Sequence, residues 1–353
     1  MSLSEFPAAA SPHDLAVTAE RCAAQLLGGN PAGSAEEVAE RLLAIQAQDP
    51  RGARLAIRAR SAGLSASDVD SALARRSLIV TWLNRGTLHL VRAEDYWWLH
   101  PLTTPQMRTG NSRRLAQEGV PPEAAERAVA IVRAALSDGP LTRSQLRERV
   151  AAAGVRTEGQ AMVHILALAS IRGLIVRGPA AGRDQAFVLV QDWLGAPPAA
   201  ISREAALGEL ARRYLAGHAP AADRDLAQWA GMGLRDARLG LAGCGAVPRA
   251  DGLAALPVNP QRAAVALPPP LLLGAFEPLL LGWATRDPIV GPHRRIVTAG
   301  GLFRPFALAG GRAVATWNIA GGQVVLAPFA LLDTQTQTAL GTEAADVTRF
   351  LGV

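Results

Sequence analysis

The sequence predicts an α+β protein in which a unit of helices followed by a two-stranded hairpin occurs three times, ahead of a small antiparallel β-sheet or barrel. Signals for helices and hairpins alternate in this order before Pro257, and the segments after it are proline-rich and β-branched. A unit of this kind is a winged helix-turn-helix. We therefore expect three such modules, at residues 1–118, 119–197 and 198–258, and a C-terminal antiparallel β domain with a terminal helix at residues 259–353.

Helix-capping signals and strand patterns define the first module. Ser11 is an expected N-cap, and Ser34-Ala-Glu-Glu37 has the pattern of a capping box that opens a second helix. A third helix is expected from Ser65 to Arg76. The segments 78–83 and 87–91 read as strands joined by the turn Asn84-Arg85-Gly86, which predicts a hairpin, and in the second strand Leu88 and Leu90 alternate with Thr87 and His89.

The same order recurs twice. In the second module helices are expected at residues 122–136 and 158–172, with another opened by the capping segment Thr142-Arg-Ser-Gln145, and strands at residues 173–177 and 186–190. The third is expected at residues 202–216, 223–230, 234–241, 246–249 and 253–258. This recurrence is one of architecture and not of sequence.

The C-terminal domain is expected to be mainly β. Residues 271–283 are strongly apolar, and glycine turns separate the β-branched stretches that follow. Strands are predicted at residues 296–298, 302–308, 313–319 and 323–327, with a final helix near residues 342–350.

The basic side chains are unusual because the chain contains no lysine, so all 36 lysine-plus-arginine positions are arginine and the net charge is +6. An arginine guanidinium can donate two parallel hydrogen bonds to one phosphate, so an arginine-rich chain favours nucleic acid as a partner. The codon bias of a GC-rich genome accounts for the lysine deficit but not for where the arginines lie. Without lysine, a P-loop, a pyridoxal Schiff base and a lysine nucleophile are all excluded.

The cysteines, the histidines and the hydropathy of the chain bear on metal binding, cofactor binding and cellular location. Cys22 and Cys244 are too few for a disulfide framework or a zinc site, and the six histidines show no ligand spacing. We therefore expect neither a metal nor a cofactor. No window approaches the ~20 apolar residues that a membrane helix needs, so a cytoplasmic protein is expected.

The segment Arg41-Leu-Leu-Ala-Ile-Gln-Ala-Gln-Asp-Pro50 contains the main candidate site. It is expected to be the end of an apolar helix, which Pro50 stops. In a helix Gln46 and Gln48 would point to nearly opposite sides, whereas an extended backbone places both on one side. The two amides either cap a helix C-terminus or form a site beside the arginines that follow. Asp49 is the adjacent carboxylate, and its place before Pro50 also fits plain chain reversal.

The glutamine segment and the hairpin segments together resemble the motifs of a known protein family. Gln-Ala-Gln after an amphipathic helix, followed by Thr81-Trp-Leu-Asn-Arg-Gly-Thr-Leu-His-Leu90 and Asp95-Tyr-Trp-Trp-Leu99, resembles the winged-helix DNA glycosylases of the AlkZ/YcaQ type, in the subgroup with a Gln–apolar–Gln motif. Further similar segments at 277–283 and 301–317 extend the resemblance over most of the chain. It implies a DNA repair enzyme that hydrolyses the N-glycosidic bond of alkylated purines in double-stranded DNA, with Gln46 and Gln48 as the catalytic residues.

The chemistry of such a reaction fits two neutral amides. Glycosidic hydrolysis passes through an oxocarbenium-like state that carboxylates usually stabilise. A purine alkylated at N7 or N3 is already cationic and leaves as a neutral base, so positioning a water can suffice. N7-alkylguanine is the first expected substrate, and interstrand cross-links and self-resistance to a genotoxic natural product are further candidates. The lack of lysine predicts a monofunctional glycosylase without a strand-nicking lyase step.

Several other residues are candidates around this motif. Asp49, Thr87 and His89 are candidates for a catalytic or pocket role, although a lone strand histidine is often structural. Those expected to contact DNA phosphates are Arg51, Arg54, Arg58, Arg85, His293, Arg294 and Arg295. A solvated surface is the alternative for these side chains.

Two non-enzymatic functions remain open at this point. One is a winged-helix transcription regulator in which the glutamines cap a helix, and the other is an architectural DNA binder. The predicted recognition helix 158–172 is mostly apolar, and the sequence has no coiled-coil dimerisation helix. Both observations count against a regulator. We expect a monomer with no protein partner.

Overall fold

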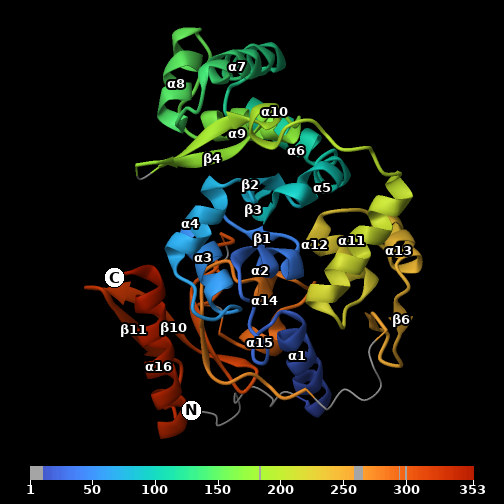
Figure 1. The fold of residues 1–353 in the computed structure, drawn as a ribbon, viewed down its shortest axis with the longest axis vertical. Helices are drawn as coiled ribbons and strands as arrows, with labels where there is room; N and C mark the ends of the chain where they lie inside the picture. The colour runs from blue at the N-terminus through green and yellow to red at the C-terminus, as the bar shows by residue number, and fades with distance from the viewer. Residues whose placement is uncertain (1–10, 183, 258–264, 294, 299) are drawn as a thin grey trace, which may run out of the picture.

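The computed structural model describes residues 11–182, 184–257, 265–293, 295–298 and 300–353. It confirms a mixed α+β fold with several small antiparallel sheets. Within the described residues, one sheet has five strands in the order β1-β3-β2-β4-β5, one has four in the order β11-β10-β9-β8, and one pairs β6 with β7. Figure 1 shows the first sheet between the upper helices and the body of the molecule, and the second at the opposite end beside the C-terminal helix.

The first part of the chain forms the centre of the body. Its elements are α1 (Pro12–Ala24), α2 (Ala35–Leu42), β1 (Ile45–Gln46), α3 (Pro50–Arg58), α4 (Ala66–Ala74), β2 (Leu78–Leu83) and β3 (Thr87–Arg92). The N-caps are confirmed, because Ser11 accepts a hydrogen bond from the Asp14 amide and Ser34 accepts one from the Glu37 amide, but the capping box is incomplete, since the Glu37 carboxylate accepts from the Gly33 amide and not from that of Ser34.

The expected role of Pro50 is wrong. Helix α2 ends at Leu42, where Leu43 adopts a left-handed backbone with φ of 61°. Pro50 instead begins α3 at a position where its missing N–H costs nothing, and the Asp49 side chain caps that helix by accepting from the Arg51 amide. The glutamine segment is therefore extended backbone between two helices.

The second part of the chain forms the top of the molecule in Figure 1. It comprises η1 (Ala93–Asp95), α5 (Tyr96–Thr103), α6 (Met107–Gln117), α7 (Pro122–Ala135), η2 (Leu136–Asp138), α8 (Arg143–Ala152), α9 (Ala161–Ile171), β4 (Ile175–Ala181), β5 (Asp184–Leu189) and α10 (Val190–Leu194). The β4–β5 hairpin extends further than the sequence predicts. Val80 of β2 pairs with Arg177 of β4, so the first two hairpins belong to one sheet.

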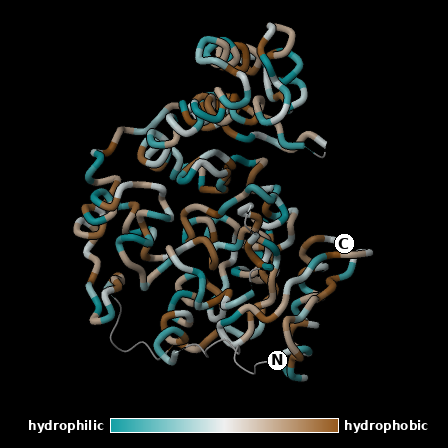
Figure 2. The backbone as a smooth tube through the Cα atoms, turned by 180° about the vertical axis from the view of Figure 1, so that it is seen from behind, coloured by the Kyte–Doolittle hydropathy of each residue, from teal (hydrophilic) through white to brown (hydrophobic). Residues whose placement is uncertain are grey.

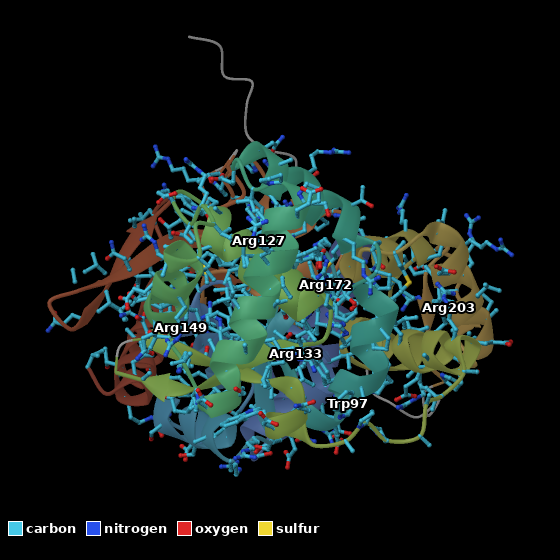
Figure 3. The ribbon with its side chains drawn as sticks, turned by 90° about the horizontal axis from the view of Figure 1, so that it is seen from above. Trp97, Arg127, Arg133, Arg149, Arg172 and Arg203 are labelled. Atoms are coloured by element: carbon cyan, nitrogen blue, oxygen red, sulfur yellow. The ribbon has the colours of Figure 1, made fainter. Side chains whose placement is uncertain are left out.

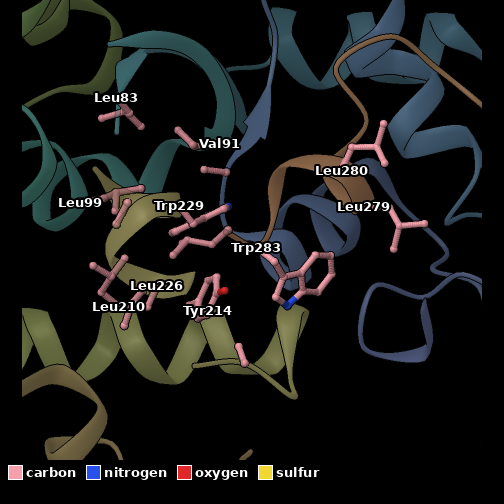
Figure 4. Packing of buried hydrophobic residues seen from close by; sticks show 14 of the residues in the cluster. Leu83, Val91, Leu99, Leu210, Tyr214, Leu226, Trp229, Leu279, Leu280 and Trp283 are labelled. Carbon is pink, nitrogen blue, oxygen red and sulfur yellow. The ribbon is translucent and has the colours of Figure 1, made fainter. Parts of the chain in front are cut away.

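The third part adds α11 (Arg203–His218), α12 (Asp223–Ala230), α13 (Leu234–Gly243), β6 (Val247–Pro248) and β7 (Ala254–Ala255), close to the expected positions. Its helices share a core with the large sheet. Figure 4 shows Tyr214 and Trp229 between the sheet residues Leu83 and Val91 on one side and Trp283 on the other. This core therefore joins all four parts of the chain.

The last part forms the four-stranded sheet and the C-terminal helix. Its elements are β8 (Leu271–Leu273), α14 (Pro278–Leu281), α15 (Asp287–Val290), β9 (Phe306–Ala309), β10 (Arg312–Ala320), β11 (Gln323–Pro328) and α16 (Thr334–Leu351). The strands expected at 296–298 and at the start of 302–308 are reduced to one bridge between Val297 and Phe303. The final helix is much longer than expected and starts with Asp333 as its N-cap.

Helix α3 holds the glutamine segment against this last part. Gly52 of α3 lies in direct contact with the carbonyl of Ala275, an approach that leaves no room for a side chain. About one and a half turns further along the helix, Arg58 binds Glu343 and Asp346 of α16 and the carbonyl of Leu272. The position of α3 is therefore fixed by residues more than two hundred positions away.

Along the backbone, apolar and polar residues alternate at short intervals (Figure 2). Among the described residues, no helix is long and apolar enough to cross a membrane.

Candidate active site

The two glutamines lie at the edge of the five-stranded sheet. In β1, Gln46 pairs with His89 of β3, and His89 pairs in turn with Thr81 of β2. These three residues therefore form a row on one face of the sheet. The chain is extended from Gln46 to Gln48, which places their side chains on the same side, as the sequence allowed.

A hydrogen bond joins the two amides. Nε2 of Gln46 donates to Oε1 of Gln48 over 2.6 Å. Gln46 is 6% exposed, whereas Gln48 is exposed to solvent beyond the end of β1. The pair therefore has a buried member that is held in place and an accessible member that can meet a substrate.

Arg85, at the tip of the β2–β3 hairpin, fixes the direction of this pair. Its Nη2 lies 3.4 Å from Oε1 of Gln46, and its Nη1 donates to the carbonyls of Gln228 and Trp229 at the end of α12. A guanidinium only donates, so the atom of Gln46 that faces it must be the oxygen. Nε2 of Gln46 then faces Gln48, which leaves the amide nitrogen of Gln48 as a donor towards solvent.

His89 is neutral in this environment. It is 2% exposed, and its Nδ1 lies 2.9 Å from the carbonyl oxygen of Thr87, so that nitrogen carries the proton and donates. Burial, with a smaller contribution from the charge of Arg85, lowers the pKa of His89 to about 3. Burial also lowers the pKa of Arg85, followed by repulsion from Arg286. The row of Gln46, His89 and Thr81 is therefore uncharged, and the Arg85 guanidinium lies beside it.

The other two pocket candidates have different surroundings. Asp49 is half-buried, and its Oδ1 accepts from the Arg51 amide over 2.9 Å, so part of its hydrogen-bonding capacity holds the start of α3. Thr87 is half-buried, and within the described part of the chain its Oγ1 is buried without a hydrogen-bond partner.

The arginines of α3 do not share one role. Arg51 is exposed on the first turn. Arg54 forms an ion pair with Asp70 and also donates to the Pro50 carbonyl, so its charge is neutralised. Arg58 is 4% exposed and lies between Glu343 and Asp346, at 2.8 Å and 2.9 Å. A phosphate contact by Arg58 does not fit this geometry, because α16 covers its side chain. The helical periodicity that groups Arg58 with Arg51 cannot reveal this cover.

The second basic cluster, His293, Arg294 and Arg295, lies only partly within the described residues. Arg295 is exposed, and Arg294 lies outside the described residues. His293 stacks on Phe329 with ring centroids 4.0 Å apart, and burial lowers its pKa, so it is a neutral aromatic contact and not a cation at neutral pH.

Other arginines are spread over the helices of the upper face. Figure 3 labels five of them, Arg127, Arg133, Arg149, Arg172 and Arg203. Two are paired, since Arg172 binds Glu126 and Arg203 binds Asp236. Positive charge is therefore distributed over this surface and partly balanced by carboxylates.

A cleft of about 700 Å³ opens beside Gln48. It lies between α3 and α4 on one side and the β4–β5 hairpin on the other, and Val80, Leu88 and Leu90 of the large sheet contribute to its lining. In Figure 1 this is the region between α4 and β4. Because Val80 and Leu90 alternate with Thr81 and His89 along their strands, this lining belongs to the sheet face opposite to the row of Gln46, His89 and Thr81, and Gln48 lies at its rim.

Sequence reasoning missed the contribution of Arg85 to the glutamine pair and the presence of Arg177 in the cleft. The sequence predicts a phosphate contact for Arg85. It cannot show that backbone carbonyls hold this side chain, because they come from α12, 143 residues away. Arg177 lines the cleft only because β4 joins the sheet of the first hairpin. No local pattern signals either relationship. Within the described residues, no cluster of three or more histidine, cysteine or acidic side chains is arranged to hold a metal.

Comparison with known families identifies the class of protein to which this fold and site belong. The DNA glycosylase AlkZ-like family matches residues 39–350, and the chain therefore belongs to this family of DNA glycosylases. This confirms the resemblance that the glutamine and hairpin motifs indicated.

A curated relative and a solved structure, both from Streptomyces sahachiroi, show how far the similarity extends. An interstrand DNA cross-link repair glycosylase is 28% identical over an alignment of 364 positions that covers 96% of each chain. The solved structure of the DNA glycosylase AlkZ superposes with a TM-score of 0.76 at 26% identity, again over 96% of both chains.

Proposed function

We propose that this protein hydrolyses the N-glycosidic bond of cationic alkylpurines in duplex DNA, with N7-alkylguanine as the first substrate and interstrand cross-links as a further one. The observation that carries the proposal is the Gln46–Gln48 amide pair, oriented by Arg85 at an accessible sheet edge. The similarity to a cross-link repair glycosylase over nearly the whole chain supports the same substrate class.

In the proposed mechanism the amide pair positions the attacking water. The outward Nε2 of Gln48 donates to the water, and the water donates to the remaining lone pair of Gln46 Oε1. The C–N bond breaks with its electron pair going to the base, which leaves as a neutral alkylpurine. The water oxygen bonds to C1′, and its proton passes to solvent or to the adjacent Asp49 carboxylate.

No general acid is required, because the leaving base already carries the positive charge. The absence of a general acid agrees with the sheet row of Gln46, His89 and Thr81, in which His89 is neutral and no side chain is charged. An uncharged purine would need protonation to leave, so we expect much slower release of normal bases.

The reaction should stop at the abasic site. A lyase step needs an amine that forms a Schiff base with C1′, and the chain has no lysine. We therefore propose a monofunctional glycosylase.

We further propose that the three units of helices and an antiparallel strand pair are winged helix-turn-helix modules arranged around the DNA, in a protein that acts as a monomer. The recurring order α7-α8-α9-β4-β5 and α11-α12-α13-β6-β7 supports this reading. Among the arginines first considered, Arg51 and Arg295 are exposed and remain proposed phosphate contacts.

The test is release of N7-methylguanine from a duplex that contains one such base, measured by cleavage of the abasic site with hot alkali. Gln46→Ala and Gln48→Ala should each lower the rate about 10²- to 10³-fold while DNA affinity is kept. Gln335→Ala, an exposed glutamine on α16, is the control and should not change the rate. Absence of release by the wild type, with a footprint at one particular sequence, would instead indicate a transcription regulator.

A further inference from the structure

The pairing of the glutamine strand continues beyond its last residue, Gln46. The Ala47 amide donates to the carbonyl of Leu88 over 2.7 Å, in the same register as the β1–β3 ladder. This register sets Gln48 opposite Thr87, and both side chains lie on the sheet face that carries Gln46. Directly opposed residues of antiparallel strands have Cβ atoms about 5 Å apart, so one water molecule can bridge the Thr87 hydroxyl and the Gln48 amide.

The Thr87 hydroxyl has no protein group to bind. Its Oγ1 is buried, and within the described residues no protein atom forms a hydrogen bond with it. The carbonyl oxygen of the same residue already accepts from Nδ1 of His89. A hydroxyl has one donor and two acceptor positions, and buried hydroxyls are usually paired with protein or with ordered water. Because this hydroxyl lies next to the accessible Gln48, water is the partner that can reach it.

Asn84, in the same hairpin tip, has the same property. It is 0% exposed, and neither the oxygen nor the nitrogen of its carboxamide has a hydrogen-bond partner among the described residues. Buried amides and hydroxyls of this kind are the groups that ordered internal water satisfies. The tip of the β2–β3 hairpin therefore has the chemistry of a hydrated turn beside the glutamine pair.

The hairpin tip is held against α12, so the threonine hydroxyl is fixed before a substrate binds. A Cβ on Gly231, just after α12, would meet the carbonyl oxygen of Asn84 at 3.0 Å, which shows how closely the two backbones approach. Arg85 adds hydrogen bonds to the carbonyls of Gln228 and Trp229 in that helix. Threonine is also branched at Cβ, which restricts its χ1 angle. A group that is already in place can orient a nucleophile without a cost of reorganisation.

We propose that Thr87 is a third hydrogen-bond partner of the attacking water, together with Gln46 and Gln48. This inference rests on the proposed glycosylase function and adds a catalytic residue to it. The water accepts from Nε2 of Gln48 and donates one hydrogen to Oε1 of Gln46 and the other to Oγ1 of Thr87. Two partners leave a water free to rotate, whereas three fix the direction of its remaining lone pair, which is then aimed at C1′. The hydroxyl takes up no proton, so the proton released after attack still passes to solvent or to Asp49.

Three variants separate the hydroxyl from the shape of the side chain. Thr87→Val keeps the branched shape and removes the hydroxyl, whereas Thr87→Ser keeps the hydroxyl and removes a methyl group. Thr316→Val is the matched control, because Thr316 is also a half-buried strand threonine but lies in β10. Release of N7-methylguanine from a duplex gives kcat and KM for each protein, and thermal melting measures stability.

Thr87→Val should lower kcat about tenfold and leave KM within about twofold, because the hydroxyl contacts the water and not the DNA. Thr87→Ser should keep kcat within about threefold of wild type, and Thr316→Val should change neither constant. The melting temperature of Thr87→Val should equal or exceed that of wild type, since no protein hydrogen bond is lost. An unchanged kcat in Thr87→Val would overturn the proposal, and so would an equal loss in Thr87→Ser, which would assign the effect to shape.

A crystal structure of the free protein separates failure of this inference from failure of the glycosylase proposal. Wild type should hold an ordered water within hydrogen-bonding distance of both Oγ1 of Thr87 and Nε2 of Gln48, and Thr87→Val should lack it. A wild-type structure without this water overturns the role of Thr87 even if the enzyme releases the base. If the water is present and wild type releases no base, the glycosylase proposal fails and the water site at Thr87 is supported.

Discussion

Arg85 donates a hydrogen bond to Oε1 of Gln46, so the tip of the β2–β3 hairpin contacts the glutamine strand from outside. The same guanidinium binds the carbonyl end of α12. The direction of the glutamine amides is thus determined jointly by the first and third parts of the chain.

Arg85→Lys should lower kcat for N7-methylguanine release about tenfold, with a smaller change in KM, because one ammonium cannot hold Gln46 and two carbonyls at once. Steady-state kinetics measure both constants. A phosphate contact would behave differently, since its loss weakens DNA binding and reduces the salt dependence of affinity by about one unit of slope. An unchanged kcat together with that change of slope would contradict the positioning role.

Arg51 and Arg58 lie on the same helix and should respond in opposite ways to alanine. Arg58→Ala leaves Glu343 and Asp346 without their buried partner and should lower the free energy of unfolding by about 3 kcal/mol or more. Arg51→Ala should leave stability within about 0.5 kcal/mol and weaken DNA binding. Urea denaturation and DNA titration test both variants, and a stable Arg58→Ala protein with impaired DNA binding would restore the phosphate role.

Stability should fall as the pH drops below about 6.5. Burial lowers the pKa of both His89 and His218 to about 3, so between pH 6.5 and 3 the unfolded chain binds protons that the folded protein does not. From pH 7 to 5 each histidine should cost about 2 kcal/mol of unfolding free energy. Urea unfolding at a series of pH values measures this, with His13, which is exposed, replaced by glutamine as the control.

Gly52→Ala should destabilise the protein by about 1–3 kcal/mol, because a Cβ there meets the backbone carbonyl of Ala275. Gly110→Ala is the matched control. Gly110 also lies within a helix, α6, but a Cβ there meets no atom within 4 Å in the described structure, so alanine should stabilise by up to about 1 kcal/mol. Thermal melting compares the two, and equal melting temperatures would show that α3 can move away from Ala275.

The features that could be predicted from the sequence are those set by neighbouring residues. The caps at Ser11, Ser34 and Thr142 follow from side-chain oxygens that reach amides three residues on, and each is present. The same local chemistry explains two errors. Asp49 before Pro50 is also a helix-start signal, and Asp333 with Thr336 caps a helix whose Thr-Gln repeat has low helix propensity.

The parts of the site that could not be predicted depend on distant segments. That Gln46 and Gln48 share a side follows from extended backbone, but the pairing with His89 that holds it extended involves residues more than forty positions later. Arg58 illustrates the opposite case. Its helical spacing from Arg51 is correct, yet α16 covers it and converts an expected DNA contact into an internal ion pair.

The pairing of Val80 with Arg177 has a mechanical consequence. Because one continuous sheet carries both the glutamine strand and the long hairpin of the second unit, their separation is set by hydrogen-bonded backbone and not by a hinge. A change in the spacing between these two elements would therefore require the sheet itself to deform or the β2–β4 pairing to break.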